Sequence, residues 1–182
     1  MTSIRFTATL RRPASPPSAT WLFVVLPKAA SAKLPTRGTV AVEGTLAGVA
    51  FIALAVPDGQ GGHWLKIDRP LRDAAAASPG DEAAFVIAPA ADEPEPDVPA
   101  DLRTALAAAE PATRAAWTSL KPGQRRDWID WITMPKKPET RAKRIAAARD
   151  MLGSGKRRVC CFDRSGIYGG GFAAPAAAPD DG

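Results

Sequence analysis

Cysteine and histidine are scarce in this chain of 182 residues, which contains two cysteines and one histidine. Cys160 and Cys161 are adjacent, and neighbouring cysteines rarely bridge each other without strain. Because no second pair exists to build a disulfide framework, we expect reduced thiols and a cytoplasmic location. His63 is far from both cysteines in sequence, so neither a zinc ligand set nor a Cys-His dyad has the required number or spacing of residues.

Long apolar runs are missing as well. No run reaches the roughly 18–20 apolar residues that a membrane span requires. The first residues, MTSIRFTATLRR, contain no apolar core with a small-residue cleavage site behind it. We therefore predict neither a transmembrane segment nor a signal peptide. Hydrophobic residues make up 46% of the chain, but many are alanines, which bury little area, so we expect modest cores anchored by larger side chains.

Residues 1–88 show the patterns of β-strands. Ile4, Phe6, Ala8 and Leu10 alternate with polar residues, which is the period of a strand with one buried face. A denser apolar run, 20–26, is stopped by a proline and suits a strand buried on both faces. Further strands are predicted at 39–42, 45–56, 63–67 and 83–88, with a helical turn at 71–77 and with bends or bulges tolerated at Gly44 and Gly48. About six short strands separated by turns predict a small, closed or partly closed β-barrel domain.

The pattern changes after residue 88. Residues 89–99, PAADEPEPDVP, are acidic, rich in proline and without apolar periodicity, so they predict a linker. Residues 100–168 then show helical spacing, with helices expected near 102–109, 111–120, 124–133 and 139–152. Residues 169–182 have low complexity and are predicted to be disordered. The fold class is therefore α+β: an N-terminal barrel of about six strands followed by a C-terminal bundle of three to four short helices.

Charge also divides the chain. Residues 1–96 contain nine basic and nine acidic residues, whereas residues 97–168 contain 15 basic and 8 acidic ones, a net charge of +7. This excess predicts a surface for an anionic partner, formed by Lys136, Lys137, Arg141, Lys143, Arg144, Lys156, Arg157 and Arg158. Such a surface suits a phosphate backbone, anionic lipid or an acidic protein. The alternative is a solvated helix face, partly neutralised by Glu139 and Asp150.

Two tryptophans in the basic half allow two interpretations. Trp128 and Trp131 lie three residues apart, on one face of the helix expected at 124–133. Exposed rings at this spacing would stack on a ligand or on bases. Rings at the same spacing more often belong to a core, and the neighbouring isoleucines favour that interpretation.

The helical half resembles a known family. Its stretch RRDWIDWITMPKKPETRAKRIAAARDMLGSGKRR (125–158) combines a Trp-rich helix with Lys137–Arg141 and the pair Arg144-Ile145. These features resemble the YdeI/OmpD-associated family, often labelled bacteriocin-protection. The first half, through Trp21–Pro27 and Pro57–Gly61, is similar to the small β-barrel domain of unknown function that often precedes this module in bacteria. The resemblance implies a bacterial protein linked to bacteriocin resistance or envelope stress, and it supplies no catalytic residues.

The predicted function is accordingly a non-enzymatic binding or stress-protection protein with an unknown target and no cofactor. The basic helical surface is the expected contact face. Two alternatives are a nucleic-acid-associated module and a barrel that binds a small ligand, although small barrels usually fill their interiors with side chains. An enzyme of unrecognised type would need His63 clustered with an aspartate and a cysteine, or a pocket with paired carboxylates.

Overall fold

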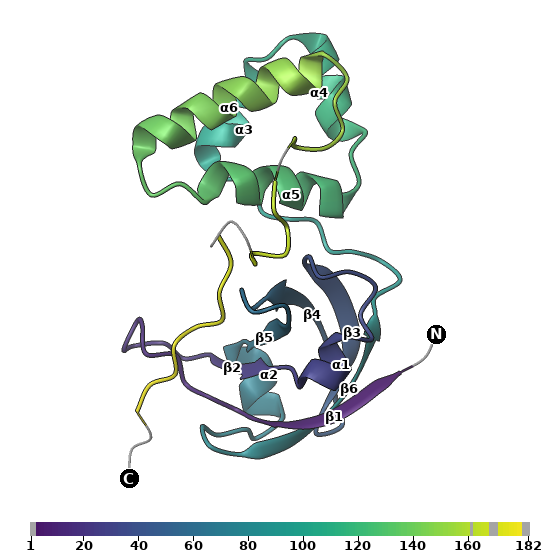
Figure 1. The fold of residues 1–182 in the computed structure, drawn as a ribbon, viewed down its shortest axis with the longest axis vertical. Coiled ribbons are helices and arrows are strands. Elements are labelled where there is room, and N and C mark those ends of the chain that lie inside the picture. Colours follow the sequence, from purple (N-terminus) through teal and green to yellow (C-terminus); the bar gives the residue numbers. More distant parts are fainter. Residues whose placement is uncertain (1–2, 161, 168–170, 180–182) are drawn as a thin grey trace. The chain divides into compact units, whose positions relative to one another are not determined.

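The computed structural model describes residues 3–160, 162–167 and 171–179. They form two compact units (Figure 1). The barrel unit contains the described residues up to Asp92 together with those from Asp163 onward, and the helical unit contains those between Glu93 and Phe162. The barrel unit is therefore built from two separate stretches of the chain, with the helical unit inserted between them.

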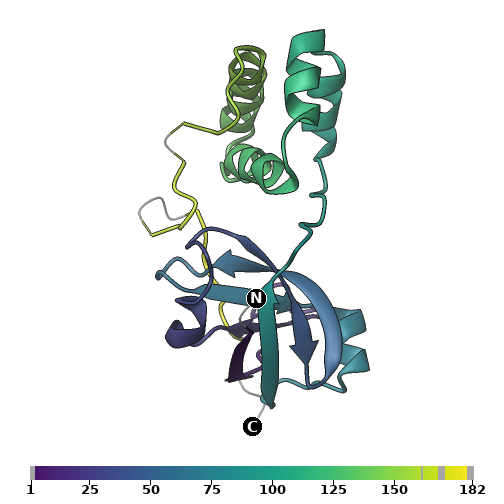
Figure 2. The same cartoon turned by 90° about the vertical axis from the view of Figure 1, so that its right-hand side faces the viewer.

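The barrel unit contains one six-stranded antiparallel sheet with the order β1-β6-β3-β4-β5-β2. Its strands are β1 (Ile4–Thr9), β2 (Leu22–Val25), β3 (Val40–Leu46), β4 (Val49–Pro57), β5 (His63–Ile67) and β6 (Glu82–Pro89). The sheet curls so that its two outer strands approach each other (Figure 2). There Arg11 and Phe23 exchange two backbone hydrogen bonds of 2.9 and 2.8 Å. This arrangement confirms the predicted partly closed barrel.

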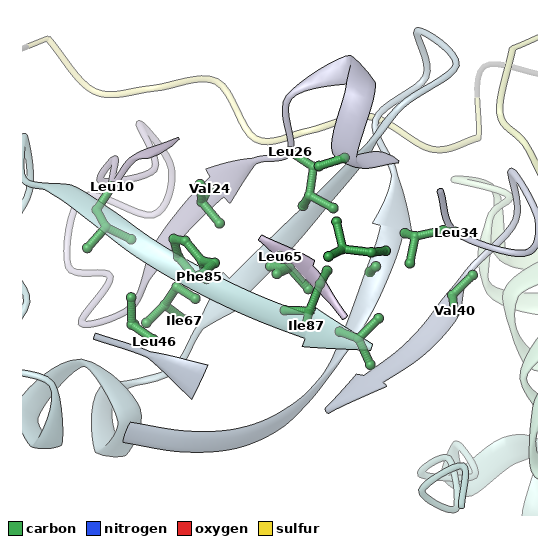
Figure 3. Packing of buried hydrophobic residues seen from close by; sticks show 14 of the residues in the cluster. Leu10, Val24, Leu26, Leu34, Val40, Leu46, Leu65, Ile67, Phe85 and Ile87 are labelled. Carbon is green, nitrogen blue, oxygen red and sulfur yellow. The ribbon is translucent and has the colours of Figure 1, made fainter. Parts of the chain in front are cut away.

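The alternation of residues predicted the buried faces of the outer strands. In β1, Ile4 is buried while Arg5, Thr7 and Thr9 are exposed. In β2, Leu22–Val24 are buried, in agreement with the dense apolar run. Figure 3 shows Val24, Leu65 and Phe85 pointing into the interior. The core is therefore formed by the inward faces of the strands, as expected for a small barrel.

One predicted strand is wrong. The stretch 45–56 divides at a tight turn, because Ala47 and Gly48 have φ values of 48° and 86°. Two consecutive residues with positive φ form the kind of turn that matches the twist of a hairpin. Gly44 is neither a bend nor a bulge: it lies within β3, paired with Phe51 on one side and with Ile87 on the other. A short helix, α1 (Lys28–Ser31), follows β2 and was not predicted, whereas α2 (Arg69–Ala74) lies near the expected helical turn.

The helical unit contains α3 (Ala100–Ala107), α4 (Pro111–Thr118), α5 (Pro122–Thr133) and α6 (Pro138–Gly153). Three of these helices begin at a proline, which suits the first helical position because its missing N–H would have no helical partner there. The buried residues of this unit form a second core, made of Leu102, Leu106, Leu120, Trp128, Ile129, Ile132, Ala148 and Leu152. The predicted bundle of short helices is thus confirmed. None of the helices in the described ranges is both long and apolar enough to cross a membrane.

After the helical unit the chain returns to the barrel unit. We call residues 163–167 and 171–179 the C-terminal strap. Its backbone is bonded to the barrel at two places: Ala14 N–H donates to Ala176 O, and Ala178 N–H donates to Arg12 O, both at 2.8 Å. A tail expected to be disordered therefore makes specific backbone contacts where it is described. Residues 169–170 and 180–182 of that tail lie outside the described residues.

Candidate functional site

The barrel unit contains a cavity of about 550 Å³. It is formed by α1, the loop after α1, the turn between β4 and β5, and one residue of the C-terminal strap. Its lining consists of Lys28, Ser31, Ala32, Leu34, Pro35, Thr36, Arg37, Gln60, Gly61, His63 and Ile167. Binding sites for small molecules commonly occupy about 300–1,000 Å³, so the cavity has the size of such a site.

The lining carries positive charge. Lys28 and Arg37 contribute cationic side chains, and none of the described residues in the lining carries a carboxylate. Leu34, Pro35 and Ile167 supply apolar surface in the same cavity. The cavity therefore suits a molecule that has a negative group and an apolar part.

A buried hydrogen-bonded pair lies in the cavity wall. The Ser31 Oγ is 2.6 Å from His63 Nδ1, and His63 Nε2 is 3.0 Å from the carbonyl oxygen of Gly38. A carbonyl oxygen only accepts, so Nε2 carries the ring proton, and Nδ1 accepts from the Ser31 hydroxyl. Ser31 and His63 are only 5% and 1% exposed.

The surroundings of His63 keep it neutral. Burial lowers the pKa of His63 below its ordinary value of 6.5, and this outweighs the Gly38 hydrogen bond and the charge of Asp58, which act in the opposite direction. Asp58 also shapes the turn before β5, because its carboxylate accepts hydrogen bonds of 2.8 Å from the N–H groups of Gln60 and Gly62. A neutral imidazole whose Nδ1 accepts a hydrogen bond from a hydroxyl group can take the proton of that group.

Sequence reasoning missed this pair. The sequence placed His63 in a predicted strand and gave it no zinc or Cys-His partner, and it gave no reason to single out Ser31. The two residues are 32 positions apart, so no local pattern connects them. Within the described ranges, no group of three or more His, Cys, Asp and Glu residues is placed to hold a metal ion. Cys160 is exposed, and Cys161 lies outside the described residues.

Three of the predicted surface arginines have partners inside the helical unit. Arg141 donates from Nε and Nη2 to the carboxylate of Asp101, at 2.6 and 2.8 Å, so that α6 is joined to α3. This hydrogen-bonded pair lowers the pKa of Asp101 and raises the pKa of Arg141. Arg144 donates to the Trp131 carbonyl, and Arg157 donates to the Ser119 carbonyl at 2.7 Å, just after α4. These arginines connect the elements of the bundle.

The other five predicted basic residues are different. They are exposed, and their side chains have no ion-pair or hydrogen-bond partner among the residues that the structure describes: Lys136, Lys137, Lys143, Lys156 and Arg158. The predicted surface thus divides into arginines engaged in the bundle and side chains open to solvent. Only the second group offers charge to a partner without breaking a contact within the bundle.

The two tryptophans belong to the packing of the helical unit. Trp128 is completely buried, and its ring meets that of Trp131 edge-on, with 6.2 Å between centroids. Trp131 is half-buried, and the guanidinium of Arg144 lies over its ring at 5.1 Å. The core interpretation therefore describes Trp128, and the side chain of Arg144 covers a face of Trp131.

Each half of the chain matches the model of a known protein family. Residues 6–87 match the model of a domain of unknown function, DUF1905, and include both Ser31 and His63. Residues 95–155 match the model of a family described as bacteriocin-protection, YdeI or OmpD-associated. No curated protein matches the chain. The chain is therefore similar to DUF1905 over residues 6–87 and to the bacteriocin-protection, YdeI or OmpD-associated family over residues 95–155, which confirms the resemblance seen in its sequence.

Proposed function

We propose that this protein acts by binding, and that the barrel unit holds a small organic anion in its cavity. The observation that carries the proposal is a cavity of about 550 Å³ whose described lining residues include Lys28 and Arg37 and no carboxylate. The family name associates the helical half with bacteriocin protection, and a protective role through binding agrees with that name.

The chemistry of the lining indicates the kind of ligand. A carboxylate or phosphate would accept charge-assisted hydrogen bonds from Lys28 and Arg37, which are stronger than those between neutral groups. The apolar remainder of the ligand would lie against Leu34, Pro35 and Ile167. An inorganic ion would leave this apolar surface in water, so we expect an anion with a hydrocarbon part.

Thermal unfolding with a small panel of compounds tests the proposal. Hexanoate, benzoate and phenyl phosphate are the anions, and benzyl alcohol is the neutral control. A ligand at about 100 times its dissociation constant stabilises the folded state by about 2.7 kcal/mol, which is easily measured. We expect stabilisation by at least one anion but not by benzyl alcohol.

Two double variants complete this test. Lys28→Ala with Arg37→Ala removes both cations of the lining, and the stabilisation should disappear. Arg5→Ala with Lys33→Ala removes two exposed cations that do not line the cavity, and the stabilisation should remain. Equal stabilisation of both double variants, or no effect of any anion on the unaltered protein, would refute the proposal.

The helical unit supports a second candidate, a nucleic-acid-associated surface. Its support is the set of five exposed basic side chains without a partner in the described part of the chain. Fluorescence anisotropy with mixed DNA and RNA oligonucleotides, at low and near-physiological salt, tests it. Binding should weaken steeply with salt, because each phosphate contact releases a counterion.

The ion pairs of the helical unit determine which basic residues should be changed in the oligonucleotide-binding test. Reversing Arg141 would break its contact with Asp101, so lost binding could reflect altered packing. Changing Lys136, Lys137 and Lys143 to glutamate leaves the bundle contacts in place and should abolish binding. Changing Arg5, Arg11 and Lys33 to glutamate is the matched control, because it reverses three exposed cations of the barrel unit and should leave binding unchanged. No binding at low salt would exclude this candidate and favour an acidic protein partner.

A further inference from the structure

We infer that Ser31 is a nucleophile, activated by His63, and that the cavity accepts the acyl group of a small carboxylic ester. This inference rests on the proposed function for the charge of its substrate, an ester that also carries a carboxylate or phosphate. It goes beyond binding, because it assigns a hydrolytic reaction to the barrel unit. The sequence analysis, by contrast, predicted a protein without enzymatic activity.

The geometry contains the three parts that a hydroxyl nucleophile needs. The nucleophile and the base are 2.6 Å apart, from Ser31 Oγ to His63 Nδ1. The base is oriented by a third group, because His63 Nε2–H donates to the Gly38 carbonyl at 3.0 Å. This carbonyl fixes the tautomer that leaves Nδ1 able to accept the hydroxyl proton.

Neighbouring elements hold both partners in place. His63 is the first residue of β5 and pairs with Pro57 of β4, and its carbonyl accepts a 2.9 Å hydrogen bond from Leu26 N–H. Ser31 is the last residue of α1, and its N–H donates to the Pro27 carbonyl at 2.9 Å. The helix and the sheet therefore set the distance between hydroxyl and imidazole, so neither side chain depends on a loose loop for its position.

Ser31 and His63 are buried from bulk solvent but line the cavity. Both side chains are almost fully buried, yet both line the cavity of about 550 Å³. A hydroxyl group in such a place meets a molecule in the cavity rather than bulk water. Lys28 and Arg37 lie in the same lining, and their positive charge suits the carboxylate or phosphate of the proposed substrate.

The reaction balances with water as the only co-reactant. Ser31 Oγ forms a bond to the ester carbonyl carbon while its proton moves to His63 Nδ1. The bond between this carbon and the alcohol oxygen then breaks, and the leaving oxygen takes the proton from Nδ1. Water attacks the acyl carbon in the same way, giving its proton to Nδ1, and Ser31 leaves with that proton. The products are a carboxylic acid and an alcohol, with both residues restored.

Diisopropyl phosphorofluoridate, a neutral serine reagent, tests the nucleophile. Ser31 Oγ would replace fluoride on phosphorus, and mass spectrometry would find one adduct on the peptide that contains Ser31. The exposed serines Ser18 and Ser78 are internal controls and should stay unmodified. Ser31→Ala should lose the adduct, and His63→Gln should react at least ~10²-fold more slowly, the usual minimum contribution of a general base. An unmodified Ser31 in the folded protein would overturn the inference.

The dependence of the labelling rate on pH gives a measurement that needs no variant. Only the neutral imidazole accepts the hydroxyl proton, so the rate should rise as His63 loses its proton and become constant at neutral pH. The midpoint should lie below 6.5, because burial lowers the pKa of His63, with Asp58 as the opposing charge. Lys28 and Arg37 are the other charged residues of the described cavity lining. A rate that still rises between pH 7 and pH 9 would contradict the role of His63.

Release of 4-nitrophenolate from 4-nitrophenyl hydrogen succinate tests turnover, and loss of release in Ser31→Ala would support it. If the reagent labels Ser31 but the unmodified protein does not release 4-nitrophenolate, the acyl transfer is refuted.

Protection of Ser31 from the neutral reagent by benzoate or hexanoate then separates the two proposals. Labelling without protection leaves the nucleophile standing and removes the anion site. Anion binding without labelling leaves the binding function standing and removes the nucleophile.

Discussion

At the scale of residues, the helical unit buries charge that is incompletely compensated. Arg126 of α5 is almost fully buried, and its Nε and Nη2 have no hydrogen-bond partner in the described part of the protein. Its Nη1 is 3.7 Å from a carboxylate oxygen of Glu93. On the same helix, burial raises the pKa of Asp130 to about 6, with the charge of Asp127 adding to the effect and Arg126 opposing it. Folding of this unit therefore disfavours the ionised form of Asp130.

The substitution Asp130→Asn should stabilise the protein at pH 7 and have little effect at pH 4. In the folded state the pKa of Asp130 lies above its ordinary value of 3.8. Burial of the protonated Asp130 therefore does not reduce the free energy of unfolding below pH 3.8, where this side chain is protonated in both states. As pH rises through about 6, the free energy of unfolding falls, because ionisation of Asp130 is favoured more in the unfolded state. Asparagine avoids this loss, and we expect a gain of roughly 1–2 kcal/mol at pH 7. Urea unfolding followed by circular dichroism at both pH values measures it.

Asp150→Asn is the matched control for this prediction. Asp150 lies on α6 and is exposed, so its replacement should change the free energy of unfolding little at either pH. An Asp130→Asn variant with the same change in stability at pH 4 and pH 7 would show that ionisation of Asp130 is not the cause.

At the scale of elements, Gly44 allows β3 to pair closely with the strands on both of its sides, β4 and β6. Gly44 pairs with Phe51 of β4 and with Ile87 of β6. A Cβ atom at Gly44 would lie 1.9 Å from the carbonyl oxygen of Val86 and 2.8 Å from the Cα of Ile87. The close approach of β3 and β6 therefore depends on glycine at this position, and both strands belong to the wall of the barrel.

Gly44→Ala should destabilise the barrel unit strongly. The methyl group would meet backbone rather than a flexible side chain, so β3 and β6 would have to move apart. Overpacking of this kind costs about 1–3 kcal/mol, and we expect the upper part of that range. Gly48→Ala is the control: its φ is 86° but nothing lies near its Cβ position, so we expect a loss of about 1 kcal/mol. Thermal unfolding of both variants measures the difference, and equal losses would contradict the role of Gly44.

At the scale of the whole molecule, the barrel unit depends on residues that follow the helical unit in sequence. The C-terminal strap bonds to Arg12 and Ala14, and Ala174 N–H donates to the Asp58 carbonyl at 3.3 Å. The strap also supplies Ile167 to the cavity lining. The domain match at residues 6–87 therefore omits a part of the chain that completes the unit and its candidate site.

A chain that ends after Phe162 should keep its helical unit and lose stability in the barrel unit. The loss of these backbone hydrogen bonds should destabilise the barrel unit by about 2 kcal/mol. Hydrogen exchange followed by mass spectrometry should show faster exchange in peptides covering residues 11–14 and 58–62. Peptides from α3 to α6 should be unchanged. Removal of residues 180–182 alone is the control, and unchanged exchange in the longer truncation would show that the strap is dispensable.

The sequence by itself determined the features that depend on neighbouring residues. The alternation from Ile4 to Leu10 predicted both the strand and its buried face, because side chains on a strand point alternately to opposite sides. The helical spacing after residue 100 predicted a bundle of short helices. The ordered motif at 137–145 was sufficient to indicate the family.

The tertiary structure decided which distant residues meet. Ser31 and His63 are 32 positions apart, and Arg141 and Asp101 are 40 apart. Neither pairing follows from a local period, because contacts between elements depend on the order of strands and the packing of helices. The basic segment looked uniform in sequence, yet the fold uses some of its arginines to connect helices and leaves the lysines in solvent. The cavity likewise exists only because a curled sheet, a short helix and the C-terminal strap come together.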